Sequence, residues 1–142
     1  MKHVNVNNHY STMFIIMILS GLLSTMNIWV DKYDDIRLSV NDVYMTLLMS
    51  GWMFLFMGIF YQEINIFILG LIIVIIIIWC IRTQFFITEY QYKLSMIPHH
   101  SMAVHMSKKL LEKENNRQHP FLTNIINTQE SEIVIMKTSN YL

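Results

Sequence analysis

The sequence IFILGLIIVIIIIWCI, at residues 66–81, decides what kind of fold this chain adopts. It contains no charged residue, and every residue from Ile72 to Ile78 is β-branched. In water such a run is a poor helix former, because β-branched side chains lose rotamer freedom in a helix. In hydrocarbon, however, the backbone can satisfy its hydrogen bonds only internally, which imposes a helix. The stretch therefore predicts a membrane-spanning helix.

Two earlier segments have the same character. Residues 12–30 and 43–61, like residues 65–81, are almost free of charge, and a helix needs about 20 apolar residues to cross the hydrocarbon. A charge at mid-span costs roughly 2.5–3.5 kcal/mol. The flanking charges accordingly fall at or beyond the span ends, at Asp31, Asp42, Glu63 and Arg82. The sequence thus predicts an all-α membrane protein with a three-span anchor at residues 12–81.

Composition excludes several functional classes. The 142 residues are 54% hydrophobic with a formal net charge of zero and no basic tract, which argues against nucleic acid as a partner. The single cysteine, Cys80, excludes a disulfide framework and a Cys-x-x-Cys pair. All four glycines precede residue 71, so the second half has no glycine-rich phosphate loop. No serine, threonine or cysteine nucleophile with a convincing base is visible, and we assign no catalytic residue.

Aromatic residues support the three-span topology of the anchor, and basic residues indicate its orientation. With three spans, Trp29, Tyr44 and Trp79 fall on one membrane face, as an interfacial belt requires. The amino-terminal face has only Lys2 near a span, whereas the opposite face has three basic residues: Lys32, Arg37 and Arg82. By the positive-inside rule, this count favours a cytoplasmic tail.

The tail, residues 82–142, has a polar composition with helical periodicity. Residues 88–114 and 120–138 are predicted as two helices joined by residues 115–119. Pro120 suits the first position of a helix, where a missing N–H has no partner anyway. Pro98 either lies inside the first helix or marks a second helix start, and it removes one backbone bond to Leu94. The prediction is a two-helix polar tail.

Three imidazoles and three thioethers gather in the first tail helix, within Met96-Ile97-Pro98-His99-His100-Ser101-Met102-Ala103-Val104-His105-Met106. These are the ligands that soft or borderline metals prefer, Cu(I) above all. At 100° per residue, His105 and Lys108 point to one side and are expected to face solvent. The opposite, inward face is predicted to carry Met96, His99, His100, Ala103, Met106, Ser107, Leu110 and Leu111, with Met102 at its edge.

The second tail helix offers a facing surface. Its apolar stripe is Leu122, Ile125, Ile126, Gln129, Ile133 and Met136, with Glu132 at the edge. A polar amide such as Gln129 within this stripe needs a partner, and the histidines of the first helix are candidates. The alternative is that the His-His pair makes only buried structural hydrogen bonds, as histidines on apolar helix faces usually do.

These residues resemble a known family. Met96-Ile97-Pro98-His99-His100 with Ala103, followed about thirty residues later by Gln129, Glu132, Ile133 and Met136, is similar to the signature of the domain of unknown function 305. Tyr44-Met45-Thr46-Leu47-Leu48-Met49 and Arg82-Thr83-Gln84 resemble its bacterial subgroup, in which three spans precede the domain. The resemblance implies a helical domain of the ferritin-like class, and some members are linked to copper binding or tolerance.

Two positions depart from that family. Glu89 stands where the family usually has an aspartate, and Gln62 and Glu63 stand where the subgroup has lysines. Those lysines would keep the hairpin between the second and third spans in the cytoplasm, with the tail outside. We follow the family and expect an extracytoplasmic tail, against the charge count given above.

The expected function is that of an integral membrane protein that binds a soft transition metal, with copper the leading ion, for buffering, tolerance or delivery. The expected ligands are His99, His100, Met96, Met102, Met106 and Met136. Glu89, Gln129 and Glu132 are expected to support them by charge or hydrogen bonds. Expected partners are the lipid bilayer and a larger membrane complex or further copies of the chain.

Two alternatives stand beside this expectation. The first is a small structural or assembly subunit of a membrane complex, with no metal. The second is an iron enzyme with carboxylate and histidine ligands, but the tail lacks the Glu-x-x-His pair of ferritin-type di-iron sites.

The three-span model predicts the compartments of two points in the chain. An odd number of spans puts the two ends of the anchor on opposite membrane faces. One span, the third, separates Asn65 from the tail. Reporter fusions after Asn65 and after Tyr141 should therefore report opposite compartments. Matching signals from the two fusions would contradict the model.

Overall fold

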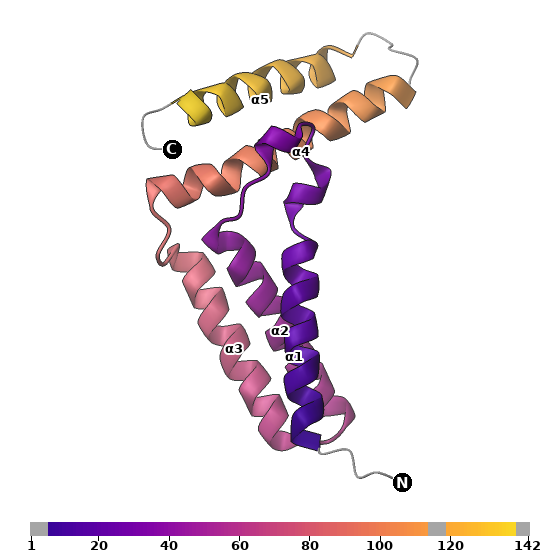
Figure 1. Cartoon of the computed structure of the whole chain (residues 1–142), viewed down its shortest axis with the longest axis vertical. Coiled ribbons are helices and arrows are strands. Elements are labelled where there is room, and N and C mark those ends of the chain that lie inside the picture. The colour runs from indigo at the N-terminus through magenta and orange to yellow at the C-terminus, as the bar shows by residue number, and fades with distance from the viewer. Residues whose placement is uncertain (1–5, 114–118, 139–142) are drawn as a thin grey trace. The chain divides into compact units, whose positions relative to one another are not determined.

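The structure is a computed structural model that describes residues 6–113 and 119–138, with side chains from residue 9 onward. Lys2, Glu114, residues 115–118 and Tyr141, which entered the predictions above, lie outside the described residues. All regular secondary structure in the described part is helical, and that part contains no strand (Figure 1). Its elements in chain order are α1 (Val6–Leu23), η1 (Met26–Trp29), η2 (Tyr33–Asp35), α2 (Val40–Phe60), α3 (Ile64–Thr83), α4 (Glu89–Lys113) and α5 (Pro120–Thr138).

The all-α prediction is confirmed, and three segments are long and apolar enough to cross a membrane: His9–Trp29, Val40–Phe60 and Ile64–Thr83. The first differs from the expected single helix, because α1 ends at Leu23 and a 3-10 turn, η1, follows. Small polar side chains after Leu23 compete for backbone groups. Ser24 N–H bonds back to the carbonyl of Gly21, and the Asn27 amide bonds across the loop to the Arg37 carbonyl.

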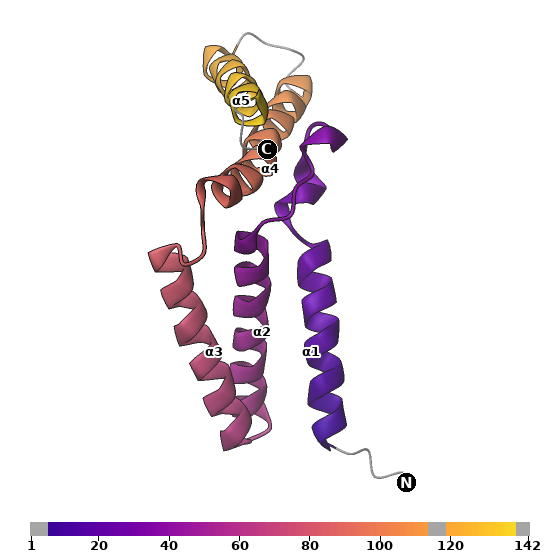
Figure 2. The ribbon, with the colours of Figure 1, turned by 60° about the vertical axis from the view of Figure 1, so that its left-hand side comes forward.

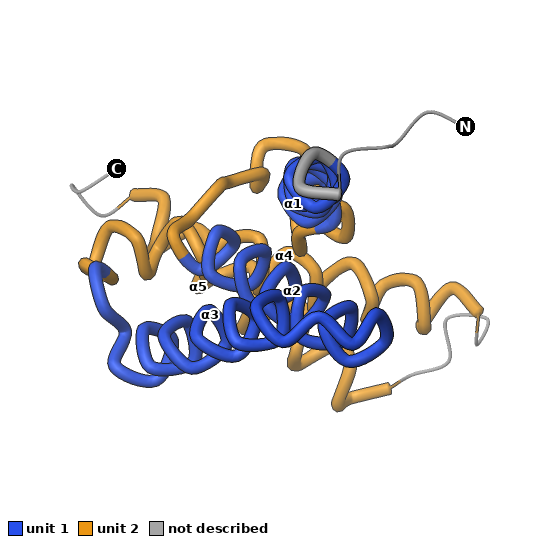
Figure 3. Tube along the Cα trace, turned by 90° about the horizontal axis from the view of Figure 1, so that it is seen from below, with its two compact units in different colours: residues 1–24, 41–86 blue, residues 25–40, 87–142 orange. Residues whose placement is uncertain are grey.

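The chain forms two compact units, shown in different colours in Figure 3. One, the membrane unit, consists of residues 1–24 and 41–86. The other, the tail unit, consists of residues 87–142 together with residues 25–40, the loop between α1 and α2. The division made from the sequence placed this inter-span loop in the anchor, whereas the structure packs it with α4 and α5.

Within the membrane unit, α2 and α3 form a close hairpin (Figure 2). The turn between them uses Gln62 at φ 56°, and Glu63 N–H bonds to the Gly58 carbonyl at 2.9 Å. Gly70 of α3 lies directly against the α2 backbone, since a Cβ there would be 2.4 Å from the Leu55 nitrogen. The absence of a side chain at Gly70 therefore sets how closely these two helices approach.

Within the tail unit, α4 and α5 pack side by side and antiparallel (Figure 1). Their bounds confirm the two predicted helices, and α4 continues through Pro98 as one helix. Ile97, Ser101 and Val104 are almost completely buried, at 0%, 0% and 1% exposure. The core of this unit therefore runs along one face of α4.

Replacing Gly70 by alanine should destabilise the membrane unit. The new methyl group would meet the Leu55 backbone, which cannot move aside without separating the helices, so we expect a loss of about 1–3 kcal/mol. Denaturation of the purified protein in detergent micelles, followed by circular dichroism, measures the change. Leu69→Ala, at an exposed neighbouring position, is the matched control, and an equal effect of both changes would contradict the close-packing argument.

Candidate metal-binding site in the tail unit

A buried carboxylate fastens the inter-span loop to the two tail helices. Asp35, at 2% exposure, accepts a 2.5 Å hydrogen bond from the Ser101 hydroxyl of α4. Its other carboxylate oxygen lies 2.7 Å from the Lys137 ammonium of α5. The Ser101 oxygen in turn accepts a 2.9 Å bond from the Asp31 backbone N–H. One carboxylate thus joins the loop, α4 and α5.

A second set of ion pairs surrounds this contact. The Lys108 ammonium lies 2.8 Å from Asp31 and 2.9 Å from Glu130, so it also bridges the loop and α5. Hydrogen bonds to Asp31 and then to Glu130 raise the pKa of Lys108 above its usual value, despite partial burial. At the other end of the cluster, Lys137 also pairs with Asp34. Ion pairs of Lys108 and Lys137 therefore hold the loop on both sides of the Ser101 contact.

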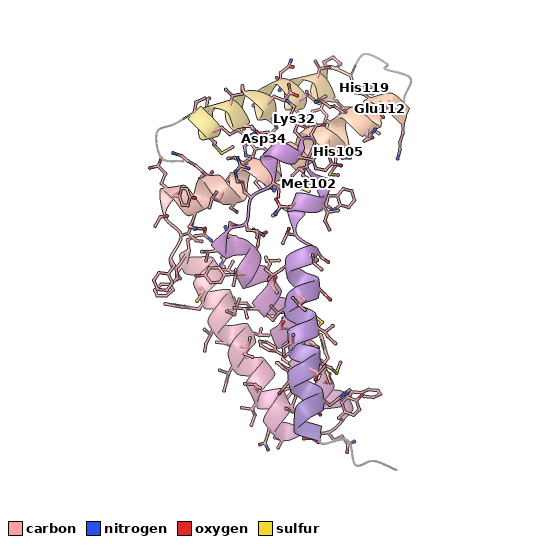
Figure 4. All side chains as sticks on the ribbon, in the orientation of Figure 1. Lys32, Asp34, Met102, His105, Glu112 and His119 are labelled. Atoms are coloured by element: carbon pink, nitrogen blue, oxygen red, sulfur yellow. The ribbon has the colours of Figure 1, made fainter. Side chains whose placement is uncertain are left out.

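The loop covers a face of α4 that the sequence predicted to be open to solvent. That prediction was wrong: Lys108 is paired with the loop, and His105 is half-buried with Nδ1 4.0 Å from Asp31. Figure 4 labels Met102 and His105 on α4, and Lys32 and Asp34 on the loop that packs there. The predicted inward face is partly exposed instead, at His99, Met106 and Leu110. Helix α4 has two packed faces, because the inter-span loop packs on one and α5 on the other.

The loop also brings a methionine to the first histidine of the His-His pair. Met26, in η1, has its Sδ atom 3.4 Å from Nδ1 of His99. Both residues are accessible, since His99 is exposed and Met26 is 37% exposed. Met26 was not predicted as a neighbour of His99, because it stands 73 residues earlier in the chain, at the end of an apolar segment where a methionine is unremarkable.

The second histidine faces the other helix. His100 Nδ1 lies 3.0 Å from a carboxylate oxygen of Glu132 on α5, and the His100 side chain is 13% exposed. Burial lowers the pKa of His100 below its usual value, although the Glu132 charge opposes this. A neutral imidazole that carries its proton on Nδ1, the nitrogen beside Glu132, keeps its Nε2 lone pair for a ligand. The residue facing this imidazole is Glu132, where the sequence pointed to Gln129.

Two methionines lie near His100 by helical register. Met96 is four residues before His100, and Met136 is four residues after Glu132, so each is one turn away on its own helix. The two helices are antiparallel and His100 lies beside Glu132. One turn before His100 on α4 therefore lies opposite one turn after Glu132 on α5, so Met96 and Met136 face the same part of the helix pair. Both are half-buried.

The other predicted site residues lie in different places. Met102 is one turn after His99 on α4, whereas Met106 is 53% exposed one further turn along. Glu89 is ten residues before His99, about 15 Å along the helix axis, and it pairs with the buried Lys93 at 2.7 Å. Glu89 thus belongs to an ion pair at the start of α4.

Oxygen, nitrogen and thiolate donors alone do not assemble a metal site in the part of the chain that the structure describes. Among residues 9–113 and 119–138, no three His, Cys, Asp or Glu side chains come together closely enough to hold one ion. The donors that approach the two histidines of the pair are the Met26 sulfur at His99 and the Glu132 carboxylate at His100.

Comparisons with known proteins connect this chain to a protein family and to an individual viral protein. Residues 87–140 match the family model described as "Domain of unknown function (DUF305)". The chain is also 43% identical over 136 residues to the "Uncharacterized protein L153" of Acanthamoeba polyphaga mimivirus, a match that covers 89% of this chain and 88% of the relative. At that coverage the match includes both apolar and tail segments. No solved structure matches the chain.

Removing the Asp35 carboxylate should detach the loop from the helices. Asp35→Ala leaves Lys137 and Ser101 without their buried partner, a type of change that costs about 3–5 kcal/mol. Trp29 lies in η1, so its fluorescence during denaturation, in a background with Trp52 and Trp79 changed to Phe, reports loop docking. Asp34→Ala removes an exposed partner of the same lysine and should change the transition little. Equal shifts for both variants would contradict the central role of Asp35.

Proposed function

The chain belongs to the DUF305 family, a designation that assigns no activity, and from its own geometry we propose that it is a multi-pass membrane protein whose tail unit binds a soft transition-metal ion, with Cu(I) preferred. The observation that carries the proposal is the approach of His99 Nδ1 to Met26 Sδ at 3.4 Å. At the distances that Zn²⁺ keeps in proteins, about 2.0 Å to imidazole and about 2.3 Å to cysteine sulfur, tetrahedral angles put the two donor atoms about 3.5 Å apart. The observed spacing fits this requirement.

The chemistry of the donors favours copper over harder ions. Thioether sulfur is a soft ligand that selects Cu(I), whereas Mg²⁺ and Ca²⁺ require oxygen ligands. Met102 follows His99 by one helical turn and supplies a further thioether on the same side of α4. The accessible position of His99 and Met26 lets an ion enter without opening the core.

The proposed role is metal buffering, tolerance or delivery. We place the tail unit outside the cytoplasm, following the family resemblance of the sequence. A bound ion held by neutral imidazole and thioether groups exchanges readily with other carriers, because neither ligand must be protonated to release it. Such a site suits storage and transfer of an ion.

A structural role is the second candidate, and the polar contacts of the tail unit favour it. His99 and Met26 also satisfy the geometry of a weak hydrogen bond, and His100 lies at ion-pair distance from Glu132. In this case the protein would be a small assembly subunit of a membrane complex. Loss of the histidines would then weaken the fold and leave metal content unchanged.

Cu(I) binding by the double variant His99→Ala/His100→Ala discriminates between the two functions. The full chain in detergent micelles is titrated with Cu(I) in competition with a chromogenic Cu(I) chelator. Loss of two nitrogen ligands should weaken binding by roughly a hundredfold or more, since even supporting residues account for tenfold to hundredfold. Circular dichroism of the variant should remain that of the parent.

His9→Ala and Met17→Leu, both in α1, are matched controls for the residue types and should bind Cu(I) as the parent does. A parent protein that takes up no Cu(I), together with a double variant that loses helicity, would refute metal binding and support the structural role.

A further inference from the structure

The two adjacent histidines face different elements of the tail unit. His99 meets Met26 of the inter-span loop, whereas His100 meets Glu132 of α5. Consecutive residues on a helix do not face each other, and the two rings are 6.0 Å apart between centroids. We propose that they hold two separate soft-metal positions, an exposed outer position at His99 and a half-buried inner position at His100. This inference rests on the proposed function.

The outer position consists of His99 Nδ1 and Met26 Sδ. Both atoms are neutral donors, and none of the acidic groups of the Asp35 cluster is paired with either of them. An ion here keeps its positive charge uncompensated, and both side chains are accessible to water. The outer position should therefore bind weakly and exchange fast.

The inner position is centred on Nε2 of His100. A carboxylate oxygen of Glu132 lies 3.0 Å from the other ring nitrogen, and a carboxylate at that place can orient a metal-binding imidazole and raise its basicity. The register of the hairpin places Met96 and Met136 one turn away on the two helices, as sulfur donors from both sides. Partial burial and the nearby carboxylate strengthen the attraction for a cation.

The two positions are neighbours along one helix, which gives them an order. An ion reaches the exposed pair of His99 and Met26 first. The His100 ring is the next residue along α4 and is less exposed. Because Glu132 compensates the charge of a monovalent cation, the inner position should have the higher affinity. The pair would act as an entry position followed by a storage position.

The stoichiometry and the two single-position variants test this arrangement. The parent protein should bind two equivalents of Cu(I) with unequal affinities in the chelator competition. Met26→Leu/His99→Ala should remove the weaker equivalent and leave the tighter one. Met96→Leu/His100→Ala should remove the tighter one, and Glu132→Gln should weaken it by about tenfold to a hundredfold. His105→Ala should preserve both.

X-ray absorption of the half-loaded and fully loaded protein adds a readout that does not depend on affinity. Each equivalent should show mixed nitrogen and sulfur ligation, and the spectrum of each variant should match one component of the parent. Binding of one equivalent that either histidine variant abolishes would overturn the two-position arrangement and leave the proposed function standing. An absence of Cu(I) binding by the parent would refute both.

Discussion

The carboxylate of Asp35 is the constraint on which the tail unit depends. An ionised side chain that is 2% exposed would be strongly unfavourable without partners. Ser101 supplies a hydrogen bond from α4 and Lys137 an ammonium from α5, so the charge is stable only when all three elements are together. This contact fixes the path of the inter-span loop, and that path in turn sets which side chains of α4 are covered and which meet Met26.

The helices were predictable from the sequence because their signals are local. Apolar segments of membrane length gave α2 and α3 within a few residues, and helical periodicity with Pro120 gave the bounds of α5. The early end of α1 was missed, since residues 24–30 carry no charged side chain and continue directly from an apolar segment. Beyond the end of α1, the Asn27 side chain bonds to the Arg37 carbonyl, a contact that hydropathy does not register.

Docking of the inter-span loop could not be predicted from one sequence. Asp35 and Ser101 are 66 residues apart, and nothing in either neighbourhood marks them as partners. Without the loop, a helical wheel assigns α4 a single buried face toward α5. The sequence therefore offered the His-His pair and Glu132 as candidates, whereas it did not predict the direction of His99, the loop beside His105 or the contact between His99 and Met26.

The tail unit is built from two segments separated by the whole of α2 and α3, and this governs the order in which the protein matures. Asp35 leaves the ribosome about 100 residues before Lys137, which at 5–20 residues per second is a delay of roughly 5–20 s. In the proposed membrane topology, α2 and α3 are inserted into the bilayer during that time, while the loop waits without its partners. A tail expressed alone, from residue 87 onward, would lack both Asp35 and Met26. In that topology, the tail unit completes its fold late, after the spans that precede α4 have been inserted.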